Sequence, residues 1–595
     1  MTAIAPTGPR ARGVYWDLAP IVADAASARA LLDSALATCD AFAERFRGKV
    51  AGLDGAGLGE ALAELARIEN AISRVGSYSG LRRSVDVNDD EARDLEAIVE
   101  QGYVKASNAL RFFELEWIAL DDATAQALVS ATEVGRDRHH LISMRRYKPH
   151  RLSEPEETML AERNPAAVSA WQNLFEQTVA NLKVPFDPGD GERAHTTDEL
   201  LAYVYSTERS LRIRALDTLY GALEPLTPVL AHCYDSLVAD RLVDDRLRSY
   251  AGPMAQRDLG NELEPAAVQA MMEAIESRSE IAHRWYRRKA ELLGVPKLVL
   301  SDQYAPLGEG REFSYDESRA LVRAAFARFA PPIEAISEAF FDERRVDAEP
   351  RQGKRGGAFC ASVAQDCKPF ILLNYTDRLR DVMTMAHELG HGMHFALSAE
   401  RQSALSFHPG IALAEVPSTF AELIVFDYLM ETETDPATRA ALVRQELESG
   451  FATVFRQTMM ARYELDAYNL RAEGKALTPD RLAELWLGRN RLQYGDAVEL
   501  PEGYRWGWSY IPHFISTRFY TYGYSFAHLA SLVLYATWRA QGPAFVERYL
   551  DFLALGGGSS PADQLGAFGI DLTLPATWHR GLDEIERLLE LALEA

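Results

Sequence analysis

This sequence of 595 residues has few cysteines, no long apolar run and no excess of positive charge. Its four cysteines, Cys39, Cys233, Cys360 and Cys367, are scattered, which argues against a disulfide framework and indicates a reducing compartment. No stretch of about 18 apolar residues occurs, so we expect no membrane-spanning helix. The first 20 residues lack the apolar core of a signal peptide. We therefore expect a cytoplasmic protein.

The charge balance is acidic, with 63 Lys and Arg against 87 Asp and Glu and a formal net charge of −24. Such a balance argues against nucleic acids and anionic membranes as partners. A hydrophobic content of 47% is ample for a large buried core. The sequence does not indicate an oligomeric state.

Apolar residues recur at helical spacing over most of the chain, which predicts a mainly α protein. Residues 183–200, rich in Pro, Gly, Asp and Thr, form the best candidate for a linker. Thr197 is expected to be the N-cap of the helix that follows. A second break lies around Gly353, Gly356 and Gly357, and the run "PFILLNY" after it is typical of a strand.

Helical pattern returns from Asp381 with "DVMTMAHELGHGMHFALSAE", which contains HExxH. His387 and His391 are four residues apart, so on a helix both imidazoles lie on one face and can bind one Zn²⁺. Glu388 lies beside the metal rather than on it, where it can take a proton from water and pass it to a leaving amine. A buried helix with hydrogen-bonded histidines is the less favoured interpretation.

A catalytic zinc site needs a third protein ligand and an open position. The longer pattern HExxHxxGxxH is not met, because His394 stands at its glycine position and Leu397 at its third histidine position. Glu400 lies about 20 Å from His387 along a helix, too far to share a metal. Glu415, in a second expected helix, is the preferred third ligand.

Two further residues near this site are assigned lesser roles. Glu422 lies seven residues after Glu415, on the same helix face, and is expected to support a ligand from behind. His394 lies on the zinc face at i+7, which is geometrically poor for a ligand, so a hydrogen bond or simple core filling is favoured for it.

Taken together, these motifs resemble the thimet oligopeptidase and oligoendopeptidase F family of zinc metallopeptidases. The resemblance rests on "HELGHGMH", "AEVPS", "GGAFC", "DQYAPL" and "IPHFISTRFYTYGYSF", and it is densest over residues 350–530. Thr419 departs from the pattern, because many relatives have Gln after "EVPS". On this basis we divide the chain into an N-terminal helical lobe, residues 1–190, and a zinc metallopeptidase catalytic region, residues 191–595.

The resemblance implies a large helical ellipsoid with a deep central channel, which admits only short unfolded peptides to one zinc ion per chain. It assigns the metal to His387, His391 and Glu415 and the general base to Glu388. It also implies that His513 and a tyrosine of the YxYxY run donate hydrogen bonds to the substrate oxyanion. Tyr524 is the first choice, because Gly523 could let the chain approach closely; Tyr522 is second, and Tyr520 is the remaining candidate.

The segments "GGAFCAS" and "PFILLNY" are expected to form a small β-sheet beside the zinc helix, with an edge that can pair with an extended peptide. The predicted function is that of a zinc-dependent endopeptidase acting on short oligopeptides. A dipeptidyl carboxypeptidase or other exopeptidase is the alternative, and a non-catalytic peptide-binding protein is a weaker one. The sequence does not reveal the physiological substrate.

Overall fold

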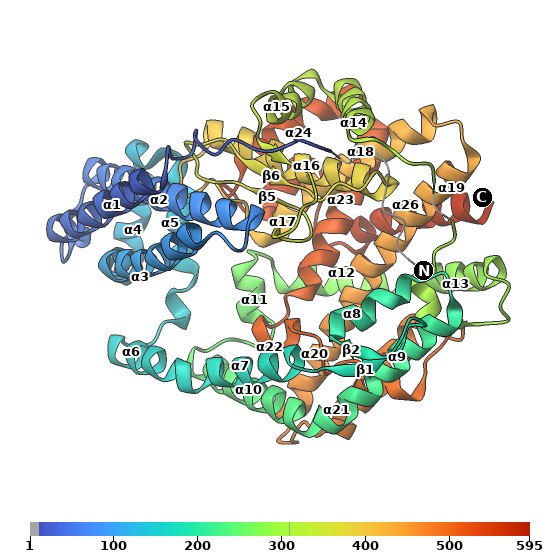
Figure 1. Cartoon of the computed structure of the whole chain (residues 1–595). Helices are drawn as coiled ribbons and strands as arrows, with labels where there is room; N and C mark the ends of the chain where they lie inside the picture. Colours follow the sequence, from blue (N-terminus) through green and yellow to red (C-terminus); the bar gives the residue numbers. More distant parts are fainter. Residues whose placement is uncertain (1–10, 309, 595) are drawn as a thin grey trace.

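The structure, a computed structural model, describes residues 11–308 and 310–594, and it is mainly α-helical (Figure 1). The expected fold class is thereby confirmed. No helix in the described part of the chain combines the length and apolarity needed to cross a membrane.

The N-terminal helices form a lobe of their own at one end of the molecule (Figure 1). Its three long helices pack against one another and enclose two hydrophobic clusters, one around Phe42 and Trp117 and the other around Leu32 and Leu95. The helices of this lobe are α1 (Ala25–Phe46), α2 (Gly55–Val85), α3 (Asp90–Ala119), α4 (Asp122–Val129) and α5 (Arg138–Arg146). Helices α6 (Glu154–Arg163) and α7 (Val168–Ala180) follow, and α7 packs against α10 (Thr227–Leu247), with Phe175 in the core of the rest of the chain.

The linker predicted over residues 183–200 is wrong in detail, because the segment is structured. Strand β1 (Val184–Phe186) pairs antiparallel with β2 (Arg193–His195), and the Pro and Gly residues form the turn between them. Helix α8 (Thr197–Ala202) follows, and its N-cap is Thr196 rather than Thr197: Thr196 and Glu199 form a capping box. The proposed division after residue 190 falls inside this hairpin and stays a prediction.

The rest of the chain shares one large hydrophobic core. Its first half contains α9 (Arg209–Leu223), α10 (Thr227–Leu247), α11 (Ala255–Gly260), α12 (Pro265–Ser277), α13 (Glu280–Leu292), α14 (Tyr315–Phe329) and α15 (Pro331–Asp342). Its second half contains α16 (Leu379–Arg401), α17 (Ile411–Ala414), α18 (Val416–Thr432), α19 (Pro436–Gly450), α20 (Arg456–Ala472), α21 (Pro479–Tyr494), α22 (His513–Ser516), α23 (Thr521–Gln541), α24 (Pro543–Leu555), α25 (Pro561–Gly566) and α26 (Pro575–Glu594).

A three-stranded sheet lies beside α16, as expected from the sequence. Strands β4 (Val346–Asp347), β5 (Phe359–Ala361) and β6 (Phe370–Leu372) occur in the order β4-β6-β5. Strand β6 pairs parallel with β4 and antiparallel with β5, which leaves β5 at an edge. Phe370 of β6 packs against Trp16, with ring centroids 6.2 Å apart, so the sheet joins α16 to the N-terminal lobe. A separate parallel pair connects β3 (Leu298–Val299) with β7 (Val498–Glu499).

Candidate active site

Helix α16 carries HExxH, and an acidic side chain in its first turn, that of Asp381, fixes where the helix begins. The carboxylate of Asp381 accepts hydrogen bonds from the backbone N–H of Thr376 at 2.6 Å and of Arg378 at 3.1 Å. The bond from Arg378 is that of an N-cap residue, the bond from Thr376 holds the chain that leads into the helix, and the negative charge favours the positive end of the helix dipole. The start of the helix, and with it the direction of both histidines, is therefore fixed locally.

Two glycines of "HELGHG" let other helices approach α16 closely. A Cβ atom on Gly390 would lie 2.6 Å from the carbonyl oxygen of Pro417 and 2.6 Å from Cα of Ser418, both in the backbone of α18. A Cβ on Gly392 would lie 2.3 Å from the ring of Phe340 in α15. Only glycine fits these contacts. Because Glu415 immediately precedes α18, the close approach at Gly390 brings that carboxylate to the histidines.

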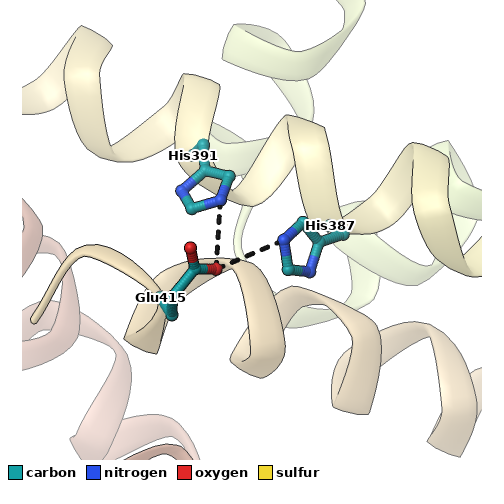
Figure 2. Close-up of side chains that lie close together, drawn as sticks. All are labelled: His387, His391 and Glu415. Carbon is teal, nitrogen blue, oxygen red and sulfur yellow. Dashed lines mark ion pairs between the residues drawn. The ribbon is translucent and has the colours of Figure 1, made fainter. Parts of the chain in front are cut away.

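His387, His391 and Glu415 converge on one point, as Figure 2 shows. Oε2 of Glu415 lies 3.3 Å from Nε2 of His387 and 3.3 Å from Nε2 of His391. Two atoms bound to one Zn²⁺ at 2.0–2.1 Å in tetrahedral geometry lie about 3.4 Å apart. The nitrogen and oxygen donors therefore have the type and spacing that a zinc ion requires, and the sequence had singled out all three.

The charges of this group depend on one another. Burial raises the pKa of Glu415, but hydrogen bonds and charges from His387 and His391 outweigh it and hold that pKa well below its usual range. Ser418 also donates a hydrogen bond to Oε2 of Glu415 at 3.1 Å. Glu415 is thus an ionised carboxylate, the form that binds a metal.

Glu422 contacts His387 on the ring nitrogen that does not face Glu415, as the sequence suggested for a residue that supports a ligand. Its Oε1 lies 2.7 Å from Nδ1 of His387. This bond fixes the proton on Nδ1 and leaves Nε2 free for a metal, an arrangement usual for metal-bound histidines. Burial lowers the pKa of His387, but Glu415 and Glu422 outweigh it and raise that pKa well above its usual range.

Glu388 follows the first histidine and is only 6% exposed. Burial raises its pKa, and the charges of His387 and His391 offset part of this rise. Among the described residues no hydrogen bond or ion pair engages its carboxylate, unlike that of Glu415. A buried carboxylate without a fixed partner, next to the three converging donors, is suited to exchange protons.

Three aromatic side chains form a cluster near this group. The ring centroid of His513 lies 6.0 Å from that of Tyr520 and 6.1 Å from that of Tyr524. Burial and the neighbouring Tyr520 raise the pKa of Tyr524 to about 12, and the charge of Glu415 adds to this rise, so its hydroxyl lies within electrostatic range of that carboxylate. Burial lowers the pKa of His513. All three side chains can donate a hydrogen bond at neutral pH.

The structure does not bring Tyr522 to this cluster. Its side chain is fully buried, and its hydroxyl donates to Oδ1 of Asp258 at 2.7 Å and accepts from Nδ2 of Asn261 at 2.9 Å. The reason lies in the helix: residues 520 and 524 are four apart and share a face, whereas residue 522 points elsewhere. The argument from Gly523 is also wrong, because a Cβ there would meet no atom within 4 Å.

His394 is not brought to the metal ligands either. It is 2% exposed, and its ring stacks near Phe552 of α24 with centroids 6.4 Å apart. Burial lowers the pKa of His394 to about 3, so it is a neutral core residue. Core filling, one of the two roles expected from the sequence, describes it.

Sequence reasoning missed the residues that hold the loop before α23. Phe519 has a backbone φ of 52°, a conformation that residues other than glycine rarely adopt. Its backbone N–H donates to Oε2 of Glu464, a fully buried carboxylate, at 2.8 Å. Next to it, Arg518 pairs with the buried Asp245 at 2.6 Å. No local signal marks Glu464 or Asp245, because each lies more than 50 residues from its partner.

Two family models match parts of the chain. Residues 329–584 match Peptidase family M3, and residues 116–183 match Oligopeptidase F. The chain is 26% identical to oligopeptidase PepF of Bacillus subtilis over 558 residues, which cover 92% of this chain and 83% of that protein.

Solved structures share the fold over nearly the whole length. A crystal structure from Chlamydophila abortus has a TM-score of 0.86 at 21% identity, covering 98% of this chain and 99% of the other. Oligoendopeptidase-F from Enterococcus faecium has a TM-score of 0.72 at 23% identity, with 95% and 97% covered. With two matched regions and relatives named oligopeptidase and oligoendopeptidase F along most of its length, the chain belongs to peptidase family M3, as a metallo-oligopeptidase of the oligoendopeptidase F type.

Proposed function

We propose that this protein is a zinc-dependent endopeptidase that hydrolyses short, unfolded oligopeptides. The observation that carries the proposal is the convergence of two imidazole nitrogens and one carboxylate oxygen, at 3.3 Å, beside a buried carboxylate without a fixed partner. His387, His391 and Glu415 would hold the ion, one per chain. Zinc bound there supplies a Lewis acid that lowers the pKa of water and polarises a carbonyl group.

Glu388 acts as the general base and then as the general acid. Its carboxylate takes a proton from the attacking water and delivers that proton to the nitrogen of the leaving amine. The burial that raises its pKa helps it hold the proton between these two steps. Glu422 keeps His387 in one tautomer throughout, through the 2.7 Å contact.

His513 and Tyr524, with Tyr520 beside them, stabilise the negative charge that develops on the carbonyl oxygen. Their N–H and O–H groups are neutral donors in a partly buried cluster, where a hydrogen bond to an oxyanion is worth more than in water. Tyr524 remains the preferred donor, supported by its electrostatic link to Glu415. Tyr522 is now assigned a structural role.

The substrate backbone pairs with the edge strand β5, and this pairing reads main-chain groups rather than side chains. Folded proteins cannot offer an extended segment there, and the family's channel would exclude them by size. We therefore propose peptides of up to about 20 residues as substrates. The free state of all four cysteines supports a cytoplasmic location.

A peptide-cleavage assay tests the proposal against its rivals. Peptides of graded length, blocked or free at both ends, are incubated with the zinc-loaded protein, with the chelator-treated protein and with Glu388→Gln. We expect internal cleavage of blocked peptides, loss with chelator and recovery with zinc. Cleavage of free peptides alone would identify an exopeptidase. No cleavage by the zinc-loaded protein would leave only peptide binding.

A further inference from the structure

A small cavity of about 190 Å³ is lined by none of the metal-site residues: five of its eleven lining residues are tyrosines, most of the others are aliphatic, and one is a cation. The cation is Arg456, the first residue of α20, which directly follows a turn of π-helix over Phe451–Phe455. Such turns are rare and frequently occur at functional sites. The lining side chains used below are Tyr205, Gln303, Tyr304, Arg456, Tyr504 and Tyr510.

The charge of Arg456 has no carboxylate partner among the residues that the structure describes. On the same helix, Arg462 pairs with Glu276 at 2.9 Å, and such pairing is what buried arginines normally require. Burial raises the pKa values of Tyr494, Tyr504 and Tyr510, and the neighbouring guanidinium of Arg456 lowers them in part, so these phenols surround its charge.

These phenols are neutral acceptors and do not supply a negative charge. The hydroxyl of Tyr494 donates to Gln303 at 2.9 Å, and that of Tyr504 donates to Asn490 at 2.9 Å, so both offer only lone pairs to Arg456. Burial raises the pKa of Tyr494 to about 12, which keeps it protonated at neutral pH. A partly buried guanidinium with only neutral partners retains its preference for an anion.

The cavity opens beside Tyr205, which is 62% exposed and packs against Tyr304 with ring centroids 5.5 Å apart. The charges of Arg456 and of Arg380 both act on the hydroxyl of Tyr205. Arg380 is the second residue of α16, about 10 Å along the helix from His387. The start of the zinc helix therefore contributes positive charge at Tyr205.

The size of the cavity restricts its occupant. It is smaller than the 300 Å³ or more typical of a whole small-molecule site, so it holds the end of a chain rather than a complete ligand. The guanidinium N–H groups of Arg456 and the O–H groups of Tyr304 and Tyr510, which also line the cavity, are donors that match a carboxylate.

We infer that Arg456, with Tyr304 and Tyr510 beside it, binds the α-carboxylate at the C-terminus of a peptide substrate. The inference rests on the proposed peptidase function and adds a second point of recognition to it. Anchoring of the carboxyl end favours a cut at a fixed number of residues from that end, while peptides without a free carboxyl group are still cut internally but less efficiently. An acidic side chain near the end carries the same chemical group, so the experiment must distinguish the two.

Three forms of one internally quenched peptide test the site in the wild-type enzyme. The first ends in a free acid, the second in an amide, and the third in an amide with Glu as the last residue. We expect kcat/KM for the free acid to exceed that for the plain amide by about 10- to 100-fold. Equal values for acid and amide would overturn the inference while leaving the peptidase function intact. If the amide that ends in Glu has the same kcat/KM as the free acid, the site accepts a side-chain carboxylate, which contradicts the C-terminal assignment.

Variants then localise the effect. Arg456→Gln should remove the preference, so that kcat/KM for the acid is no longer higher than for the amide, and Arg456→Lys should keep part of the preference. Arg380→Gln removes a cation outside the cavity and should keep the preference; its loss there would indicate general electrostatic attraction instead. Adding residues to the amino end should not move the cut, whereas adding them to the carboxyl end should. A cut that follows the amino end would also overturn the inference.

Binding measured without turnover keeps the test independent of catalysis. The free acid and the amide are titrated into zinc-loaded Glu388→Gln and followed by tryptophan fluorescence, with circular dichroism as a check on folding of each variant. We expect the acid to bind about 10-fold more tightly or better. If no peptide is cleaved but the acid still binds preferentially, the proposed hydrolysis fails and the carboxylate site stands.

Discussion

Oε1 of Glu422 lies 2.7 Å from Nδ1 of His387, and this contact sets the tautomer of a metal ligand from the next helix. Because the bond engages Nδ1, Nε2 is the ring nitrogen of His387 that faces Glu415 (Figure 2). The metal site is therefore built by two helices, α16 and α18, rather than by HExxH alone.

Glu422→Gln should weaken zinc binding by about 10- to 100-fold, since the amide can accept the hydrogen bond but lacks the charge that makes the imidazole more basic. The dissociation constant is measured by competition with a chromogenic chelator. Glu431→Gln is the matched control, because Glu431 lies on the same helix but is exposed and pairs with Arg328. An unchanged zinc affinity in Glu422→Gln would contradict the supporting role.

Gly390→Ala should lower both zinc affinity and thermal stability. The added Cβ would lie 2.6 Å from backbone atoms of Pro417 and Ser418, so α18 must move and carry Glu415 with it. Zinc content by atomic absorption and melting temperature by differential scanning calorimetry measure the two effects. Gly488→Ala, where no atom lies within 4 Å, should keep both. Full zinc content in Gly390→Ala would show that the close approach is not needed.

Tyr524→Phe and Tyr522→Phe should affect different properties. Loss of an oxyanion donor at Tyr524 is expected to lower kcat by about 10²–10³ with little change in KM or melting temperature. Loss of the Tyr522 hydroxyl leaves Asp258 and Asn261 without their buried partner, at a cost of about 1–3 kcal/mol in stability. Steady-state kinetics and calorimetry on both variants test this, and the reverse pattern would contradict the assignment.

Glu464 is expected to make stability depend on pH. Burial raises its pKa to about 8 in the folded protein, against the charge of Arg241 and the N–H of Phe519. The folded state therefore holds a proton that the unfolded state releases near its usual pKa, so this contribution to stability is present at low pH and is lost as pH rises toward 8.

Glu464→Gln resembles the protonated form and can still accept the bond from Phe519. The melting temperature of Glu464→Gln minus that of wild type should therefore become more positive from pH 5.5 to pH 8. Glu473→Gln, at an exposed surface position, should follow wild type across this range. A constant difference between Glu464→Gln and wild type would show that Glu464 does not hold a proton in the folded protein.

The parts of the site that could be predicted from sequence are those that local geometry determines. The i, i+4 spacing places His387 and His391 on one face, and a second helix after a turn makes Glu415 available. The strands β5 and β6 were also visible, from a short apolar run and flanking glycines. In each case the information lies within a few tens of residues.

The remaining features depend on contacts between distant segments. Nothing near Tyr522 indicates Asp258, 264 residues away, and so its hydroxyl could not be assigned to the core. Helical spacing alone would have separated Tyr522 from Tyr520 and Tyr524, since a helix turns about 100° per residue. The hairpin at 184–195 was hidden for a different reason: its strands have only three residues each, and the segment that joins them is rich in turn formers.

The most direct test of the account is the zinc content and kcat of Glu388→Gln. Glu388 adjoins a ligand without being one, so the variant should keep about one zinc per chain while kcat falls by at least about 10²–10⁴. Glu415→Ala, measured beside it, should lose both metal and activity. Retained zinc with near wild-type kcat in Glu388→Gln would show that another group moves the proton, and loss of zinc would show that Glu388 is itself a ligand.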